Sequence, residues 1–168
     1  MLISYFELTR HSLRVQIFIA MQRIDLAKSE ILKMNQTDED STLSQMATAW
    51  TYLAAGEGQS QEAAYIFQEQ IDRTMASATL MNSLAVCHMQ MKSFGDAEKY
   101  LEEALAKEPS NPDIIVNLLS CLANSRAQTA RSETLIATLR KVAPNHVLLS
   151  QLTGCMQSFN AAAAQLKV

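Results

Sequence analysis

The feature that most constrains this chain is a repeat of 34 residues. Its three cysteines, Cys87, Cys121 and Cys155, are each 34 positions from the next. The same shift aligns residues 61–69 (QEAAYIFQE) with residues 95–103 (GDAEKYLEE), so that acidic, small and large apolar residues coincide. A unit this short cannot bury a hydrophobic face alone, and successive units therefore stack into one elongated array.

Each copy of the repeat has the hydrophobic pattern of two helices joined by a turn. In the clearest copy, at about 78–110, apolar residues recur every three or four positions on both sides of Lys92 and Ser93, and Pro109 closes the unit. A period of 34 residues with this layout resembles the tetratricopeptide repeat. No segment shows the alternation of a strand. We therefore predict an all-α fold, a tetratricopeptide-like helical-repeat solenoid.

The repeat also predicts how the chain is divided. Trp50 lies 34 positions before Leu84, and Pro144 takes the place of Pro109 one unit later. We predict a single solenoid domain over 1–168, with about four helix–turn–helix pairs and a terminal helical segment. The expected pairs are at about 5–36, 38–76, 78–110 and 111–144, and the terminal segment is at 145–167.

Charge is scarce and interspersed in sign. Charged residues make up 18% of the sequence, against roughly 25% in ordinary soluble proteins, which suggests that part of the surface is covered by another molecule. The net charge is −3 without a basic stripe, so neither nucleic acid nor anionic lipid is an expected partner. No apolar run reaches the roughly 18–20 residues of a membrane span. We therefore expect a soluble, cytoplasmic protein without direct membrane insertion.

Residues that could carry out chemistry are present but do not converge. The three histidines, His11, His88 and His146, fall on or beside different predicted helices. Cys87 and His88 are adjacent, and adjacent helical side chains point about 100° apart. No glycine-rich phosphate loop, HExxH or EF-hand spacing occurs. We expect no catalytic residue, no cofactor and no metal site, and hence a protein that is not an enzyme.

The cysteines are expected to be small, buried and reduced thiols. They hold equivalent positions in successive units, and packed helix axes lie about 8–10 Å apart. A disulfide needs Cα atoms within about 7 Å. The repeat spacing therefore excludes a disulfide framework.

The first helix of each pair is expected to line the concave face of the solenoid, where ligands usually dock. Spacings of three and four keep one set of residues on a single side of each first helix. The predicted partner-binding residues are Gln45, Thr48, Tyr52, Thr79, Asn82, Val86, Met89, Asp113, Val116, Ser120 and Ala123.

This predicted face carries hardly any charge. A neutral groove suits an extended or helical segment with apolar anchors. An acidic C-terminal peptide, the ligand of chaperone-binding tetratricopeptide domains, needs Lys and Arg beside Asn82, and the predicted set has none. Two alternatives stay open: a generic tetratricopeptide adaptor for a peptide or helix, such as a co-chaperone, or an inner face that is only solvated.

Several longer blocks are more specific than the repeat. They run from about Val15 to the C-terminus, and residues 38–50 (DEDSTLSQMATAW) are not predicted by a generic tetratricopeptide unit. The chain resembles the epsilon subunit of coatomer, the coat of COPI vesicles. The resemblance implies a non-catalytic coat subunit that binds the C-terminal region of the alpha subunit, at Golgi membranes and COPI-coated vesicles, in Golgi-to-ER and intra-Golgi transport. The other blocks are 23–27 (RIDLA), 61–69, 85–89 (AVCHM) and 112–118 (PDIIVNL).

Members of that family are roughly twice as long, and the resemblance places this chain in their second half. We expect a fragment, a short isoform or a truncated gene product. An uncapped solenoid end exposes apolar surface that a neighbouring repeat would cover. We therefore expect self-association through the N-terminal end. The apolar residues at this end are Leu2, Ile3, Tyr5, Phe6, Leu13 and Ile17.

Overall fold

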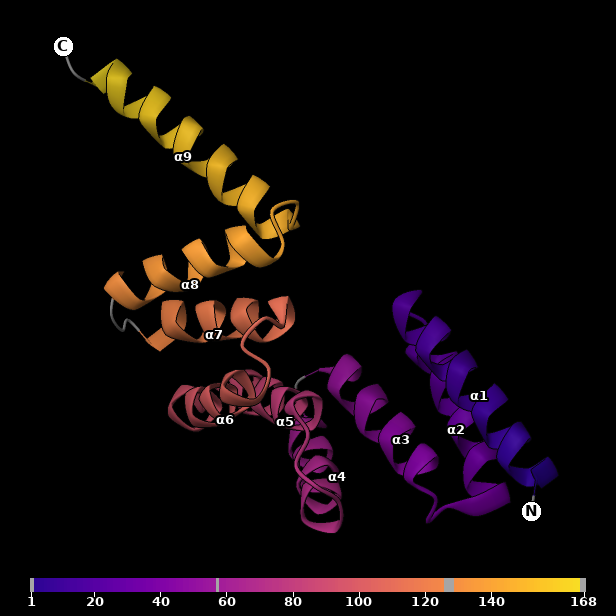
Figure 1. Cartoon of the computed structure of the whole chain (residues 1–168). Coiled ribbons are helices and arrows are strands. Elements are labelled where there is room, and N and C mark those ends of the chain that lie inside the picture. The colour runs from indigo at the N-terminus through magenta and orange to yellow at the C-terminus, as the bar shows by residue number, and fades with distance from the viewer. Residues whose placement is uncertain (1, 57, 126–128, 167–168) are drawn as a thin grey trace.

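The computed structural model describes residues 2–56, 58–125 and 129–166 (Figure 1). Over these residues the chain forms nine α-helices and no strand. The helices are α1 (Leu2–Ala20), α2 (Ile24–Asp38), α3 (Thr42–Ala55), α4 (Ser60–Arg73), α5 (Ala78–Gln90), α6 (Phe94–Lys107), α7 (Pro112–Ser125), α8 (Thr129–Val142) and α9 (Val147–Leu166).

The helices pack in the order of the sequence. From α1 to α8, each helix lies against the next. The first helices of neighbouring pairs also meet at two places, where α1 packs against α3 and α5 packs against α7. The termini lie at opposite ends of the array, and α9 extends away from α8 at the C-terminal end (Figure 1). This arrangement confirms the predicted all-α helical repeat. The assignment of the whole chain to one domain stays a prediction.

The turn inside each of the first three pairs uses a residue in the left-handed region of φ. Gln22 (φ 60°), Gly56 (φ 84°) and Lys92 (φ 62°) follow the ends of α1, α3 and α5. A positive φ reverses the chain within a few residues, at little cost for glycine and at some cost for other residues. The second helix of each pair can thereby fold back onto the first.

The first helices begin at residues that can cap them. Ser41 Oγ accepts a hydrogen bond from the amide of Ser44 before α3, and Ser77 Oγ accepts one from Leu80 before α5, both at 3.2 Å. Asn111 Oδ1 accepts the amide of Asp113 at the start of α7. These oxygens satisfy amides that have no partner within the helix. The local sequence therefore fixes where the second, third and fourth pairs start.

The core is built from small residues followed four positions later by large ones. Ala27, Ala63 and Ala97 are fully buried near the starts of α2, α4 and α6. Each lets two helices approach closely, because alanine presents only a methyl group at the crossing. The residues four positions further on, Ile31, Phe67 and Leu101, are buried in the same layers and fill the space between helices.

A cluster of polar side chains around the buried Glu30 joins α1 to α2. His11 Nδ1 lies 2.5 Å from Glu30 Oε2, and Lys33 Nζ lies 2.6 Å from Glu30 Oε1. Arg14 approaches the same carboxylate at 3.5 Å. Burial by itself raises the pKa of Glu30, but hydrogen bonds from Lys33 and His11 outweigh burial and hold this pKa at about 2. Glu30 is therefore a buried anion with cations gathered around it.

Candidate protein-binding surface

The residues predicted to bind a partner all lie on first helices, in three groups. Those of α3 are half-buried, and those of α5 are half-buried except for the exposed Thr79. Those of α7 are half-buried except for Asp113 and Ala123, which are exposed. None is in the core, so each group is available at the surface. Their role in binding stays a prediction.

The groups of α5 and α7 are joined by a side-chain hydrogen bond. Asn117 Nδ2 donates to Asn82 Oδ1 at 2.9 Å. Met89 of α5 and Val116 of α7 pack against the core that these helices share. The two groups therefore lie on neighbouring helices that are in contact, and the bond adds Asn117, which the sequence prediction did not include.

The group of α3 is held by the following helix. Gln45 Oε1 accepts hydrogen bonds from Gln70 Nε2 and from Arg73 Nη1, the latter at 3.2 Å. Gln70 is buried, at the position of α4 that corresponds to the buried Met34 in α2 and Ala104 in α6. A buried amide needs a hydrogen-bonding partner, and Gln45 supplies it. Arg73 also brings a positive charge beside a face that was expected to carry hardly any.

Two hydroxyls of the predicted face bond to their own helices. Thr48 Oγ1 donates to the carbonyl of Ser44, and Ser120 Oγ donates to the carbonyl of Val116, both at 2.9 Å. Neither hydroxyl hydrogen is therefore directed at a partner in this conformation. Tyr52 packs against the cluster shared by α3, α4 and α5. These residues present mostly apolar or already bonded surface, which suits an apolar ligand.

An apolar hollow lies at the C-terminal end of this face. Its volume is about 230 Å³, and residues of α7, α8 and α9 surround it. Ser120 and Ala123 of the predicted face line it, and none of its lining residues is charged. The sequence prediction missed the contributions of α8 and α9, because it assigned inner-facing residues only to the first helices of the second, third and fourth pairs. The other lining residues are Leu119, Ser132, Ile136, Leu148 and Leu152.

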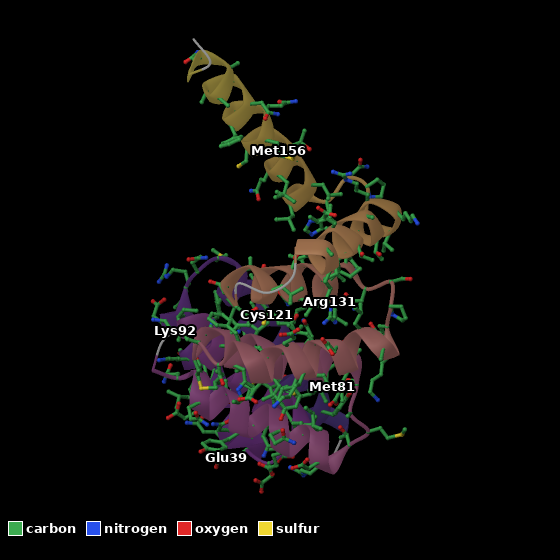
Figure 2. The ribbon with its side chains drawn as sticks, turned by 90° about the vertical axis from the view of Figure 1, so that its left-hand side faces the viewer. Glu39, Met81, Lys92, Cys121, Arg131 and Met156 are labelled. Carbon is green, nitrogen blue, oxygen red and sulfur yellow. The ribbon has the colours of Figure 1, made fainter. Side chains whose placement is uncertain are left out.

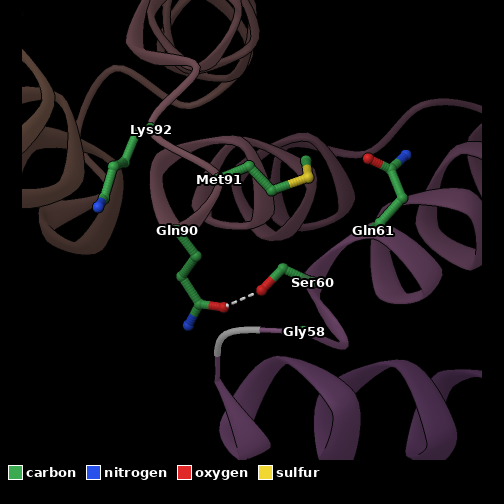
Figure 3. A pocket seen from close by; sticks show the side chains of 6 residues that line it. All are labelled: Gly58, Ser60, Gln61, Gln90, Met91 and Lys92. Atoms are coloured by element: carbon green, nitrogen blue, oxygen red, sulfur yellow. Dashed lines mark hydrogen bonds between the residues drawn. The ribbon is translucent and has the colours of Figure 1, made fainter.

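A second, polar hollow of about 370 Å³ lies where α4 begins and α5 ends (Figure 3). Ser60 Oγ donates to Gln90 Oε1 at 2.6 Å, and Gln90 Nε2 donates to the carbonyl of Leu53 at 3.0 Å. The polar groups at its centre thus bond to one another across two neighbouring pairs. This hollow is a structural junction between repeats.

The cysteines and histidines form no reactive centre. Burial raises the pKa of Cys87 to about 12 and also raises that of Cys121, and a protonated buried thiol is a poor nucleophile. His88 stacks on Tyr100 with ring centroids 5.4 Å apart. Cys155 is exposed, so the prediction that all three thiols are buried was wrong for this one. It lies on α9, which extends away from α8 (Figure 1), whereas residues of the preceding helices α3 and α4 cover Cys87.

Among the residues that the structure describes, no group of three or more His, Cys, Asp and Glu side chains is placed to hold a metal ion. No helix in these same residues is long and apolar enough to cross a membrane.

Known proteins are similar to this chain over nearly all of its length. The family model described as coatomer epsilon subunit matches residues 3–167. Coatomer subunit epsilon-1 of Arabidopsis thaliana is 38% identical over 152 residues, which are 90% of this chain and 51% of that protein. Coatomer subunit epsilon of Dictyostelium discoideum is 32% identical over 136 residues, which are 80% of this chain and 45% of that protein.

A third relative, coatomer subunit epsilon of Caenorhabditis elegans, is 32% identical over 145 residues, which are 86% of this chain and 50% of that protein. The chain spans about half the length of the curated relatives that it matches. Together with the helical repeat and the family match over residues 3–167, these similarities show that the chain belongs to the coatomer epsilon subunit family.

Proposed function

We propose that this chain is a non-catalytic scaffold of the COPI coat that binds and stabilises the C-terminal region of the alpha subunit of coatomer. The family match over residues 3–167 carries the proposal. The predicted binding residues on α3, α5 and α7 offer a weakly charged surface of the kind that an apolar segment of another chain requires. This binding takes place in the cytoplasm, at Golgi membranes and COPI-coated vesicles, during Golgi-to-ER and intra-Golgi transport.

Co-expression of this chain with the C-terminal region of the alpha subunit tests the proposal. A stoichiometric complex is expected on purification. Val86→Glu places a charge on the binding surface and is expected to weaken the complex at least tenfold. Ala106→Glu adds the same charge to an exposed position of the second helix α6 and is the matched control. Loss of the complex in both variants, or in neither, contradicts the proposed surface.

The alternative function is that of a generic tetratricopeptide adaptor, such as a co-chaperone. Arg73 beside Gln45 favours it, because an acidic peptide needs a cation. Against it, the predicted binding residues themselves include no Lys or Arg. Titration with an acidic C-terminal peptide separates the two functions. We expect no binding at 100 µM peptide, whereas an adaptor binds the peptide with a Kd below this concentration. A Kd of 100 µM corresponds to a binding free energy of about −5.5 kcal/mol.

We further propose that the chain self-associates through α1. Tyr5, Phe6 and Leu13 are 60–70% exposed and Ile17 is 49% exposed, although all are large and apolar. The side chains of Leu2 and Ile3 lie outside the described residues. Light scattering over a wide range of concentrations is expected to show a mass that rises with concentration, and Leu13→Glu is expected to abolish that rise. A constant monomer mass for the unmodified chain contradicts this part.

A further inference from the structure

Charge is nearly absent from the first helices that carry the predicted binding residues. Helices α3 and α5 contain no Asp, Glu, Lys or Arg, and α7 contains only Asp113. The second helices α4 and α6 carry several charged residues each. Arg73 of α4 brings one of these charges to the binding face, because its Nη1 donates to Gln45 Oε1 of α3 at 3.2 Å.

The acceptor of this hydrogen bond is held in place from the core. Gln70 is only 1% exposed, and its Nε2 donates to the same oxygen of Gln45. The corresponding positions of α2 and α6 hold Met34 and Ala104, so packing of the repeat does not require an amide here. A buried amide costs free energy unless it is hydrogen-bonded. This amide uses its bond to orient a residue of the binding face.

The guanidinium group of Arg73 is only partly used within the chain. Its hydrogen bonds to Gln45 and to Glu69 Oε1, the latter at 3.4 Å, both come from Nη1. Among the described residues, Nη2 and Nε of Arg73 donate to no acceptor. The side chains of Arg73 and Glu69 are 49% and 57% exposed, and an exposed ion pair of this length is weak. The edge formed by Nε and Nη2 therefore offers two parallel donors, the geometry that matches a carboxylate.

The next repeat has a cation at the same position but no amides to hold it. Lys107 lies 34 residues after Arg73, in the last turn of α6. Thr79 stands where the earlier repeat has Gln45, and the position of the buried Gln70 is an alanine. A favourable interaction with the helix dipole is enough to account for a cation at the end of α6. The two amides are therefore particular to the repeat of α3 and α4, and they act on Arg73.

An arginine of α8 gives the contrasting case, in which the guanidinium group is paired within the chain. Arg131 Nη2 lies 2.6 Å from Glu102 Oε1 of α6, and its Nη1 lies 3.4 Å from Glu98 Oε1. Figure 2 shows Arg131 where α8 meets the helices before it. Within the described residues, Arg73 has no carboxylate partner on another helix. It lies beside an uncharged helix instead.

We infer that Arg73 is a specificity-determining residue of the binding face and that its Nε–Nη2 edge binds a carboxylate of the partner segment. The segment is apolar where it covers α3, α5 and α7, and it carries an Asp or Glu side chain where α3 and α4 meet. Gln70 and Gln45 are positioning residues that hold the guanidinium group at the face. The inference rests on the proposed function, because it assigns this carboxylate to the C-terminal region of the alpha subunit.

Two physical reasons favour a carboxylate over a wholly apolar contact at this place. A partner that covers Gln45 also removes water from Arg73, and a cation that loses water without gaining an anion weakens the complex. The guanidinium group is already bonded to Gln45, so less side-chain entropy is lost when a carboxylate binds to it than at a free surface lysine. An acidic side chain is therefore the group that gains most here.

The test compares variants of the full chain in calorimetric titration with the C-terminal region of the alpha subunit. Arg73→Gln removes the charge at an exposed position and is expected to weaken binding about tenfold. Arg73→Lys keeps the charge but loses the paired donors, and is expected to weaken binding about threefold. Lys107→Gln removes a charge at the equivalent position of the next repeat and is the matched control, with an expected change of less than about twofold.

Two further arms separate binding from a role in the fold. Glu69→Gln removes the carboxylate that competes for Arg73 within the chain and is expected to raise affinity about twofold. A double-mutant cycle locates the carboxylate of the partner, whose Asp and Glu residues are changed one at a time to the corresponding amides. One such change is expected to weaken binding of the unmodified chain about tenfold and to have little effect on binding of Arg73→Gln.

Three results overturn the inference while the complex still forms and the proposed function stands. Equal affinities of Arg73→Gln and Lys107→Gln remove the special role of Arg73. Equal weakening by Glu69→Gln and Arg73→Gln assigns the arginine to the fold. Coupling of Arg73 only to the terminal carboxylate of the partner, detected by amidation of that terminus, assigns it to the binding mode of an adaptor. If the unmodified chain does not bind the alpha subunit region at all, the proposed function fails and the assignment of the carboxylate to that partner fails with it.

Discussion

Asn117 Nδ2 donates a hydrogen bond to Asn82 Oδ1 across the junction of α5 and α7, with 2.9 Å between the two atoms. Both side chains are half-buried, and the bond joins the first helices of two successive pairs. It is a direct hydrogen bond between two residues of a surface that is mostly uncharged. The bond therefore fixes the spacing of the proposed binding face as well as the packing of two repeats.

Asn117→Ala is expected to lower the free energy of unfolding by about 1 kcal/mol, because Asn82 loses its partner in a partly dehydrated site. Urea denaturation measures this change. A double-mutant cycle with Asn82→Ala isolates the pair. Strictly additive changes in the free energy of unfolding for the two substitutions would contradict a direct hydrogen bond between these amides.

Leu101→Ala is expected to destabilise the chain by roughly 2–5 kcal/mol, since Leu101 is fully buried and its removal leaves a cavity. Leu32→Ala removes the same side chain from a position that is 65% exposed, and a change of about 0.5 kcal/mol or less is expected. Thermal denaturation of both variants supplies the comparison. Similar losses in the two would show that the layer of Leu101 is not part of the core.

Acid is expected to weaken the junction of α1 and α2 through Glu30. The pKa of Glu30 is lowered from 4.5 to about 2 in the folded chain, because hydrogen bonds and charges from Lys33, His11 and Arg14 outweigh burial. The folded state therefore holds the anion more strongly than the unfolded state does. This contribution, up to about 3 kcal/mol, is present above pH 4.5 and is lost as the pH falls from 4.5 towards 2.

Urea unfolding of Glu30→Gln at several pH values between 7 and 2.5 checks this sign. The variant is expected to be less stable at pH 7 and to lose less stability on acidification than the unmodified chain. Glu103→Gln, at an exposed position of α6, is the control and is expected to keep the acid sensitivity of the unmodified chain. Parallel pH profiles for Glu30→Gln and the unmodified chain contradict the assigned role.

The three thiols are expected to differ in reactivity. Cys155 is exposed, whereas Cys87 and Cys121 are buried and burial raises the pKa of each. A maleimide at pH 7 is expected to label Cys155 at least a hundredfold faster than the other two. Mass spectrometry of peptides from a time course measures the rates. Comparable labelling of Cys87 in the folded chain would show that the α5 layer opens readily.

The 34-residue period predicted the helical repeat because the same packing of small and large side chains is needed in every unit. Ala63 and Ala97 occupy equivalent crossings, and Phe67 and Leu101 fill equivalent spaces beside them. Such positions are determined by contacts between adjacent units, which recur with the sequence. The sequence pattern alone therefore predicts the fold.

The same period could not predict features that depend on what lies outside a unit. Cys155 repeats Cys121 in sequence, but Cys121 Sγ donates to the carbonyl of Phe94 in the preceding pair, whereas Cys155 is exposed on α9, which extends away from α8. Asn117 pairs with Asn82 at a separation of 35 residues, one more than the period, so an aligned comparison of units does not reveal the bond. The apolar hollow combines three helices that the sequence prediction treated separately.

Hydrogen exchange of this chain, alone and with the C-terminal region of the alpha subunit, tests the central claim most directly. Backbone amides of α3, α5 and α7 are expected to exchange more slowly in the complex than in the free chain. Amides of the second helices α2, α4 and α6 are expected to keep the exchange rates of the free chain. Protection confined to those second helices, or no protection of any helix at saturating partner, would contradict a binding surface made by the first helices of the repeat.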